Sequence, residues 1–294
     1  MKALWFAGLL ACIGTPVLAQ DDEASQQAAV EAFIAGLDFK NGAVTVDGAN
    51  ATLKLDEGFR YLGAADAQKV LEQLWGNPPD DSVLGLVVPK AGLIDDHAWA
   101  VVLTYADEGH VSDEDASKTD YAELLAEMQE GTREANAARE EAGYGTVELL
   151  GWATAPRYDA TTRKLYWAKR LKFSESEVET LNYDVRVLGR SGYLSMNAIA
   201  DAGDFTTVEA GMQRVLAMTE FNEGSRYADF NSSTDKMASY GIAALIGGVA
   251  ASKMGLFAKL GALLIAGKKL IIPIVIGIGA LLTRVFRRKA PEQS

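Results

Sequence analysis

The chain has 294 residues, and 49% of them are hydrophobic, which is enough for a packed core and argues against a disordered protein. The formal net charge of −12 is unevenly spread: residues 237–294 hold eight Lys or Arg and one acidic residue, whereas residues 20–236 hold 19 Lys or Arg and 39 Asp or Glu. A domain this acidic repels nucleic acid, so nucleic-acid binding is excluded, while the basic tail is attracted to anionic lipid headgroups.

Residues 1–19 are predicted to be a secretory signal peptide. In MKALWFAGLLACIGTPVLAQ a lysine precedes an apolar run, which Gly and Pro interrupt before the small residues at the cleavage position. An alternative is a lipoprotein, since Leu9-Leu10-Ala11-Cys12 resembles a bacterial lipoprotein cleavage box, although VLAQ offers the better site. Because Cys12 is the only cysteine, cleavage after Ala19 leaves no disulfide, thiol nucleophile or cysteine zinc ligand.

The first half of the predicted exported domain, residues 20–221, mixes helices and strands. In chain order the patterns predict a helix, a hairpin, a second helix and two strands, at 25–37, 42–55, 66–76, 82–89 and 97–105. Asp47-Gly48 marks the hairpin turn, and Gly76 ends the second helix.

The second half is predicted to be mainly antiparallel sheet. A long helix from Asp120 to about Ala142 comes first, and a last helix occupies residues 206–221. Between them the sequence predicts four strands, at 146–153, 163–173, 180–190 and 192–201. We therefore expect one α+β domain with a mainly antiparallel sheet and a few packing helices.

The stretch GHVSDEDASKTD (109–120) offers His110, Asp113 and Asp115 as weak candidates for a metal site. A calcium-binding EF-hand loop needs Gly at its sixth position and Glu at its twelfth, but Lys118 and Leu124 stand there when the loop starts at Asp113. The pattern also fits a helix start, because Asp115 follows Ser112, and Glu123 follows Asp120, at the spacing of capping pairs. A helix start accounts for more of these residues than a metal site does.

The stretch DDHAW offers His97 with Asp95 or Asp96 as a weak catalytic candidate. A carboxylate beside an imidazole can make a general base, which favours a hydrolase or a lyase. No nucleophile motif accompanies this histidine, since GRSGYLS lacks the G-x-S-x-G spacing of a nucleophile elbow.

The strands around residues 157–190 are predicted to display a polar surface. Alternation places Asn182, Asp184 and Arg186 on one face of their strand and Tyr166 on the polar face of the preceding strand. The candidates for binding a ligand or partner are Asp159, Tyr166, Asn182, Asp184, Arg186 and Arg190. The alternative is an ordinary solvated face with cross-strand ion pairs.

Residues 237–286 are predicted to insert into a membrane, after a polar connector at 222–236 and before a basic tail at 287–294. Two helices are expected, at about 237–258 and 270–286, although a single span or a helix lying on the membrane surface is an alternative. Gly247, Ala251 and Gly255 are spaced four residues apart, which allows self-association of such helices. The basic residues do not decide on which side the tail lies.

The stretches GWATAPRYDATTRKLYWAKRL, LNYDVRVLGRSGYLSMNAIA and DEGHVSDEDA, with the Gly/Ala-rich tail, resemble the bacterial DUF2167 family of membrane-anchored proteins. The resemblance runs from about Gly36 to Lys289. It implies an exported, membrane-tethered protein of Gram-negative-type bacteria with no assigned catalytic residues. The family usually has an aromatic residue where His110 stands, which further weakens a metal role for this histidine.

The sequence as a whole favours a binding or scaffold module without a cofactor. We expect it at the bacterial cytoplasmic (inner) membrane, with its main domain on the periplasmic side and an envelope protein as partner. Two alternatives stay open: the hydrolase or lyase above, and a membrane-complex subunit that acts through its helical hairpin.

A cysteine placed in the mature, thiol-free chain tests the expected location. We predict that Ser117→Cys reacts with a membrane-impermeant maleimide in spheroplasts, because residue 117 belongs to the exported domain. Labelling of Ser294→Cys then separates a hairpin, which exposes the tail outside, from an odd number of spans, which protects it. Ser117→Cys that reacts only after permeabilisation would place the domain in the cytoplasm.

Overall fold

The computed structural model of the chain describes residues 18–77, 79–94, 97–141 and 143–247, so most of the predicted signal peptide lies outside the described residues. The chain divides into two compact units, Met1–Leu37 and Asp38–Ser294. The described part of the first unit is the helix α1, Leu18–Ala35, which covers most of the helix predicted at 25–37.

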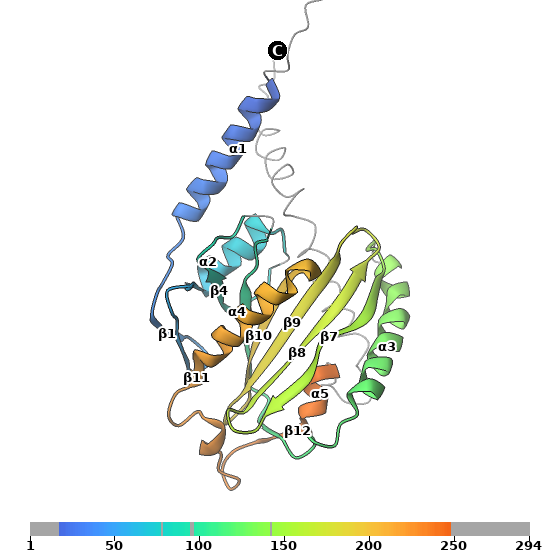
Figure 1. Cartoon of the computed structure of the whole chain (residues 1–294). Coiled ribbons are helices and arrows are strands. Elements are labelled where there is room, and N and C mark those ends of the chain that lie inside the picture. The colour runs from blue at the N-terminus through green and yellow to red at the C-terminus, as the bar shows by residue number, and fades with distance from the viewer. Residues whose placement is uncertain (1–17, 78, 95–96, 142, 248–294) are drawn as a thin grey trace, which may run out of the picture. The chain divides into compact units, whose positions relative to one another are not determined.

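The centre of the second unit is a seven-stranded sheet in which every neighbouring pair is antiparallel (Figure 1). In spatial order its strands are β3 (Phe59–Gly63), β4 (Val83–Pro89), β5 (Val101–Ala106), β10 (Tyr193–Asp201), β9 (Glu179–Leu188), β8 (Lys164–Phe173) and β7 (Val147–Asp159). The four strands predicted between 146 and 201 are therefore present.

The remaining strands form two smaller sheets. The predicted hairpin forms β1 (Ala43–Val46) and β2 (Ala51–Lys54), and β11 (Thr219–Phe221) adds to the edge of β2. A second pair is parallel: β6 (His110–Ser112) lies beside β12 (Met237–Gly241). Parallel pairing of two segments this far apart in the sequence ties the late part of the chain to the domain.

One face of the seven-stranded sheet packs against α4 (Phe205–Ala217) and the three-stranded sheet. Tyr183 and Val185 of β9 share a buried cluster with Val208 and Met212 of α4. A short 3₁₀ turn, Ala202–Asp204, leads directly from β10 into α4. This face carries the largest hydrophobic cluster of the described residues.

The opposite face packs against α3 (Tyr121–Glu141) and α5 (Ile242–Gly247). Met128 of α3 clusters with Leu171 of β8, and Ile242 of α5 clusters with Trp167. The remaining helices are α2 (Ala64–Lys69), a π-helical turn at Val70–Leu74 and a 3₁₀ turn at Tyr227–Asp229. The sheet thus has helices on both faces, and the predicted α+β class with an antiparallel sheet is confirmed.

The first predicted membrane helix does not begin at Met237, because residues 237–241 form the strand β12. The next residues form α5, whose Ile242, Leu245 and Ile246 are buried in the domain. The described helices include none that is both long enough and apolar enough to cross a membrane. The rest of the predicted membrane segment, from 248 to 286, lies outside the described residues.

The turn between β9 and β10 depends on Gly192. Gly189 donates its N–H to the carbonyl of Gly192, which closes the turn at an N···O distance of 2.8 Å. A Cβ at position 192 would overlap the backbone oxygen of Ala106 at the end of β5. Only a residue without a Cβ lets these strand ends approach each other so closely.

Gly192→Ala is therefore expected to lower the free energy of unfolding by about 3 kcal/mol, because backbone rather than a flexible side chain must move. Urea unfolding followed by tryptophan fluorescence measures the change. Gly63→Ala is the matched control, since nothing lies within 4 Å of the position that the added methyl group would take, and it should stay within about 0.5 kcal/mol of the wild type. Equal stability of the two variants would contradict the packing argument.

Candidate functional site

The register of β8 against β9 separates residues that the sequence placed on one polar face. Tyr166 lies opposite Val185, and Trp167 lies opposite Asp184. Directly opposed residues of an antiparallel pair share a face, so Tyr166 lies on the α4 face and Asp184 on the other. The prediction of a single face was wrong, because the pattern along one strand does not fix its register against the next.

Asp184 is the centre of a buried ion-pair network on the face away from α4. It is 5% exposed, and its carboxylate accepts hydrogen bonds from Lys169 at 3.1 Å, Arg186 at 3.3 Å and Asn197 at 3.0 Å. Burial by itself would raise the pKa of Asp184, but the two cations outweigh burial and hold the pKa below its ordinary value. Asn182 lies beside this network, opposite Lys169. These groups bind one another, which is a structural role.

The two remaining candidates of that set hold turns. Asp159 ends β7, and one of its carboxylate oxygens accepts the backbone N–H of Thr161 at 2.8 Å. Arg190 follows β9 and makes two hydrogen bonds to Asp235, at 2.7 and 3.0 Å, which fastens the predicted connector at 222–236 to the end of the sheet. Of the six predicted binding residues, Tyr166 lines an open groove.

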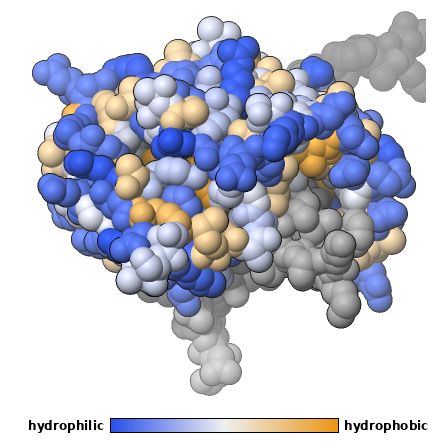
Figure 2. Space-filling view, turned by 90° about the horizontal axis from the view of Figure 1, so that it is seen from below, coloured by the Kyte–Doolittle hydropathy of each residue, from blue (hydrophilic) through white to orange (hydrophobic). Residues whose placement is uncertain are grey.

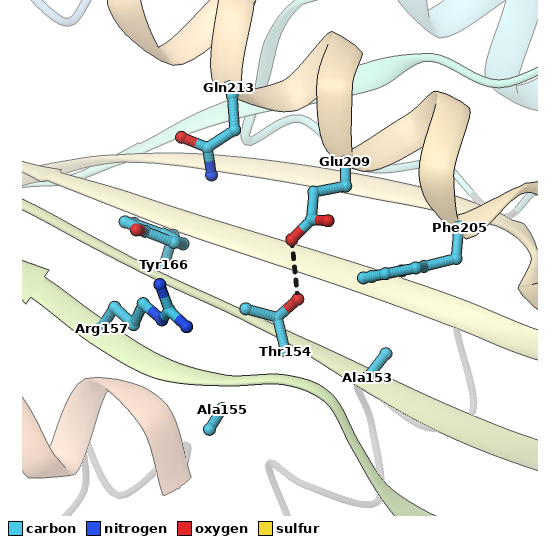
Figure 3. Close-up of a pocket in the computed structure, with 8 residues that line it drawn as sticks. All are labelled: Ala153, Thr154, Ala155, Arg157, Tyr166, Phe205, Glu209 and Gln213. Carbon is cyan, nitrogen blue, oxygen red and sulfur yellow. Dashed lines mark hydrogen bonds between the residues drawn. The ribbon is translucent and has the colours of Figure 1, made fainter.

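That cavity is an open groove of about 480 Å³ between α4 and the strands β7 and β8 (Figure 3). Its lining residues are Ala153, Thr154, Ala155, Arg157, Tyr166, Phe205, Glu209 and Gln213. In Figure 3, Tyr166, Arg157 and Gln213 lie toward one end of the groove and Phe205 toward the other. Aromatic and polar groups thus face the same space.

The local structure of α4 and β7 explains how these side chains converge. Phe205, Glu209 and Gln213 are spaced four residues apart, so they lie on one side of the helix. The pairing of β7 with β8 shifts at three places, two of them between Trp152 and Arg157. Such bulges interrupt the alternation of an edge strand and re-aim its side chains, so that neighbouring residues of β7 line the groove.

The polar groups of the groove are held in place by hydrogen bonds. Thr154 donates its hydroxyl to Glu209 at 3.0 Å, across the middle of the groove. Gln213 donates its amide N–H to the Tyr183 hydroxyl at 2.9 Å, which leaves the amide oxygen of Gln213 as an acceptor. Burial raises the pKa of Tyr183 to about 12, so this hydroxyl stays protonated. The exposed Arg157 supplies the groove's cation.

A second hollow of about 320 Å³ adjoins the groove and shares Ala153 and Phe205 with it. It is lined further by Trp152, Arg170, Leu181 and Ala202. The side chain of Trp152 itself lies on the face away from α4, because Trp152 is opposite Lys169, and its ring N–H donates to the carbonyl of Tyr121 of α3 at 3.2 Å. The two hollows form one elongated depression that passes Phe205.

The metal candidates at 110–115 are engaged in holding the chain together. The His110 ring stacks between Tyr227 and Phe230, with centroid distances of 4.1 and 4.0 Å. The Asp113 carboxylate accepts the hydroxyls of Tyr158, at 2.7 Å, and Tyr227, at 3.2 Å. Asp113 also pairs with Arg163.

The other carboxylates of this loop act as helix caps. Asp115 accepts the backbone N–H groups of Ile242 and Ala243, at the start of α5. Asp120 accepts those of Ala122 and Glu123, at the start of α3. The predicted cap at Asp120 is confirmed, whereas Asp115 caps a helix far away in the sequence. Within the described ranges, no three His, Cys, Asp or Glu side chains are grouped as a metal site needs.

The catalytic candidate His97 is largely exposed and pairs with a carboxylate that the sequence did not suggest. Its Nδ1 lies 2.8 Å from Oδ1 of Asp204, the residue before α4. The expected partners Asp95 and Asp96 lie outside the described residues. Neither His97 nor Asp204 is among the residues that line the groove or the second hollow.

Sequence reasoning missed most of the groove, namely Thr154, Arg157, Phe205, Glu209 and Gln213. The four-residue spacing of Phe205, Glu209 and Gln213 was a usable signal, because it places the three side chains on one side of the helix. The bulges of β7 leave no comparable signal.

On the face of the molecule shown in Figure 2, hydrophilic residues predominate and hydrophobic patches are small and separate, as the acidic composition leads one to expect.

Comparison with known proteins identifies a family but no activity. A family model described as "Protein of unknown function (DUF2167)" matches residues 38–279. No curated protein matches the chain in sequence.

Among solved structures, the chain is similar to the cyanobacterial PsbP protein CyanoP from Synechocystis, with 9% identity and a TM-score of 0.36 over 64% of this chain and 96% of that one. It is also similar to the Ran-binding protein Mog1p of Saccharomyces cerevisiae, with 9% identity and a TM-score of 0.34 over 63% and 96%. LpqN of Mycobacterium tuberculosis, described as involved in cell envelope biogenesis, gives 11% identity and a TM-score of 0.30 over 65% and 95%.

The stacked His110 predicts a pH dependence of stability. Burial lowers the pKa of His110 below its ordinary value of 6.5, against an opposing hydrogen bond with the carbonyl of Arg190. The unfolded chain therefore takes up a proton near pH 6.5 that the folded protein does not yet bind, and the free energy of unfolding falls as the pH drops through that value. His110→Phe keeps an aromatic ring in the stack and is expected to remove this part of the pH dependence.

Urea unfolding of the wild type and His110→Phe between about pH 8 and pH 5 measures the difference. As the pH falls, the free energy of unfolding of the wild type should decrease more than that of His110→Phe. Parallel curves would show that His110 titrates equally in the folded and unfolded states.

Proposed function

The chain belongs to the DUF2167 family, and from that premise we propose that it is a binding module of the bacterial cell envelope whose ligand occupies the groove between α4 and the strands β7 and β8. The observation that carries the proposal is the groove itself. It combines two aromatic side chains with four polar ones, namely Tyr166 and Phe205 with Thr154, Arg157, Glu209 and Gln213. Ligand sites of proteins have this combination of apolar walls and a few convergent polar groups.

Two polar side chains of the groove are held in place by hydrogen bonds before a ligand binds, as a binding site requires. Gln213 is held by the buried Tyr183, and Glu209 by Thr154. Side chains that are fixed before a ligand arrives lose little conformational entropy on binding. The surrounding sheet and helix are packed through the largest hydrophobic cluster of the described residues, which keeps the two walls of the groove at a fixed separation.

In this proposal the domain lies on the periplasmic side of the cytoplasmic membrane. The signal-peptide pattern of residues 1–19 and the apolar run with its basic tail support that location. The parallel pair β6–β12 and the buried α5 hold the beginning of the apolar run against the domain. The binding site would then be presented to the periplasm by an anchored domain.

A ligand screen by thermal unfolding tests the function. We expect at least one small polar molecule to raise the Tm of the wild type by about 5 °C at a concentration about 100 times its Kd. The shift should be lost in Arg157→Ala, which removes the groove cation. Arg133→Ala is the matched control, because Arg133 lies exposed on α3 and pairs with Glu130; it should keep the full shift. Equal shifts in wild type and Arg157→Ala, or no shift with any compound, would contradict the proposal.

A further inference from the structure

We infer that the ligand of this groove is a carbohydrate chain, specifically a neutral oligosaccharide that lies along the depression past Phe205. The inference rests on the proposed binding function and adds the chemical class of the ligand. Four features of the groove argue for it: the shape of its polar groups, its aromatic side chains, its length and its charge.

Three of the four polar side chains that line the groove are planar and bidentate, Thr154 being the exception. Arg157 presents N–H donors side by side, while Glu209 and Gln213 each carry two polar atoms on one carbon. Neighbouring hydroxyls of a sugar ring have a matching spacing and can each donate and accept. Such groups suit a ligand with many hydroxyls better than one with a single charged group.

The aromatic side chains supply the complementary apolar contact. Tyr166 and Phe205 line the groove. The face of an aromatic ring is electron-rich and attracts the polarised C–H groups on one side of a sugar ring. Two aromatic side chains toward opposite ends of the groove fit a ligand made of more than one ring unit.

The length of the depression fits several such units. The groove of about 480 Å³ and the hollow of about 320 Å³ share Ala153 and Phe205, so a chain can pass from one to the other. Both are partly open to solvent. An elongated open site binds part of a longer chain without enclosing its ends.

The edge of β7 does not suit an added peptide strand. Pro156 has no N–H to donate, and it lies within the part of β7 that lines the groove. Nearer the start of β7, Gln129 and Asn136 of α3 already donate to the carbonyls of Leu149 and Val147. A peptide would lose the main-chain pairing that gives strand addition its affinity.

Charge argues for a neutral ligand. Arg157 is balanced by Glu209 on the opposite wall, and the second cation, Arg170, is paired with Glu179 at 3.4 Å. The acidic domain around the groove repels polyanions. A ligand hydroxyl that replaces Thr154 at Glu209 exchanges one hydrogen bond for another, so the bridge across the groove does not bar a sugar.

Titration of the full chain in a sugar-free zwitterionic detergent with cellotetraose, maltotetraose and chitotetraose tests the inference. Calorimetry reports binding and gives the Kd. We expect at least one tetrasaccharide to bind with a Kd below about 1 mM. Hydrogen bonds and ring stacking at a solvent-exposed site give affinities of about this order.

Variants of the groove then locate the bound sugar. Phe205→Ala should weaken binding about tenfold, while Phe205→Tyr, which keeps the ring, should stay within about twofold. Glu209→Ala should weaken binding by a similar factor of about ten.

The outcomes separate this inference from the binding function. If no tetrasaccharide binds at about 10 mM, a concentration ten times the expected upper Kd, but the thermal screen finds a ligand that depends on Arg157, the groove binds a ligand of another class and the carbohydrate inference fails alone. If neither experiment finds binding at the groove, both proposals fail. Sugar binding that Phe205→Ala leaves unchanged in a folded variant also overturns the inference, since the sugar then lies elsewhere.

Discussion

The antiparallel pairing of β8 with β9 is the constraint on which both faces of this protein depend. Because Tyr166 is set opposite Val185 and Trp167 opposite Asp184, one face receives side chains that pack under α4 and the other receives the buried ion pairs of Asp184. A slip by one residue would exchange the two sets and bury Lys169 against the hydrophobic cluster below α4. The cost of burying an unpaired charge keeps this register unique.

The acidic loop after β6 shows how residues that look like a site can instead fasten the chain. His110, Asp113 and Asp115 each contact segments more than 40 residues away: the stack with Tyr227 and Phe230, the hydroxyl of Tyr158, and the first turn of α5. With the Arg190–Asp235 pair they hold the segment 222–247 to the end of the sheet. The start of the long apolar run is therefore part of the domain and not a free linker.

The groove forms where the regularity of the sheet ends. Inner strands such as β9 have both neighbours and bury their side chains, but β7 has one partner strand, and its bulges turn successive side chains toward α4. Helix α4 contributes Phe205, Glu209 and Gln213 from a single stripe, while its other side is occupied in the core. An irregular edge strand beside a regular helix leaves room for a ligand at the margin of a rigid layer.

The resemblance of longer stretches indicated the family, and local patterns in the sequence were sufficient to predict the α+β class, the hairpin around Asp47-Gly48, the strands between 146 and 201 and the cap at Asp120. These features follow from alternation, turn residues and caps, which act over a few residues. The folded chain was needed to show that Asp184 pairs with Lys169, that Asp115 caps α5, that residues 237–241 form a strand and that Tyr166 shares a groove with Phe205. Those contacts depend on strand register, bulges and chain reversal, which bring together residues whose separation in the sequence carries no periodic signal.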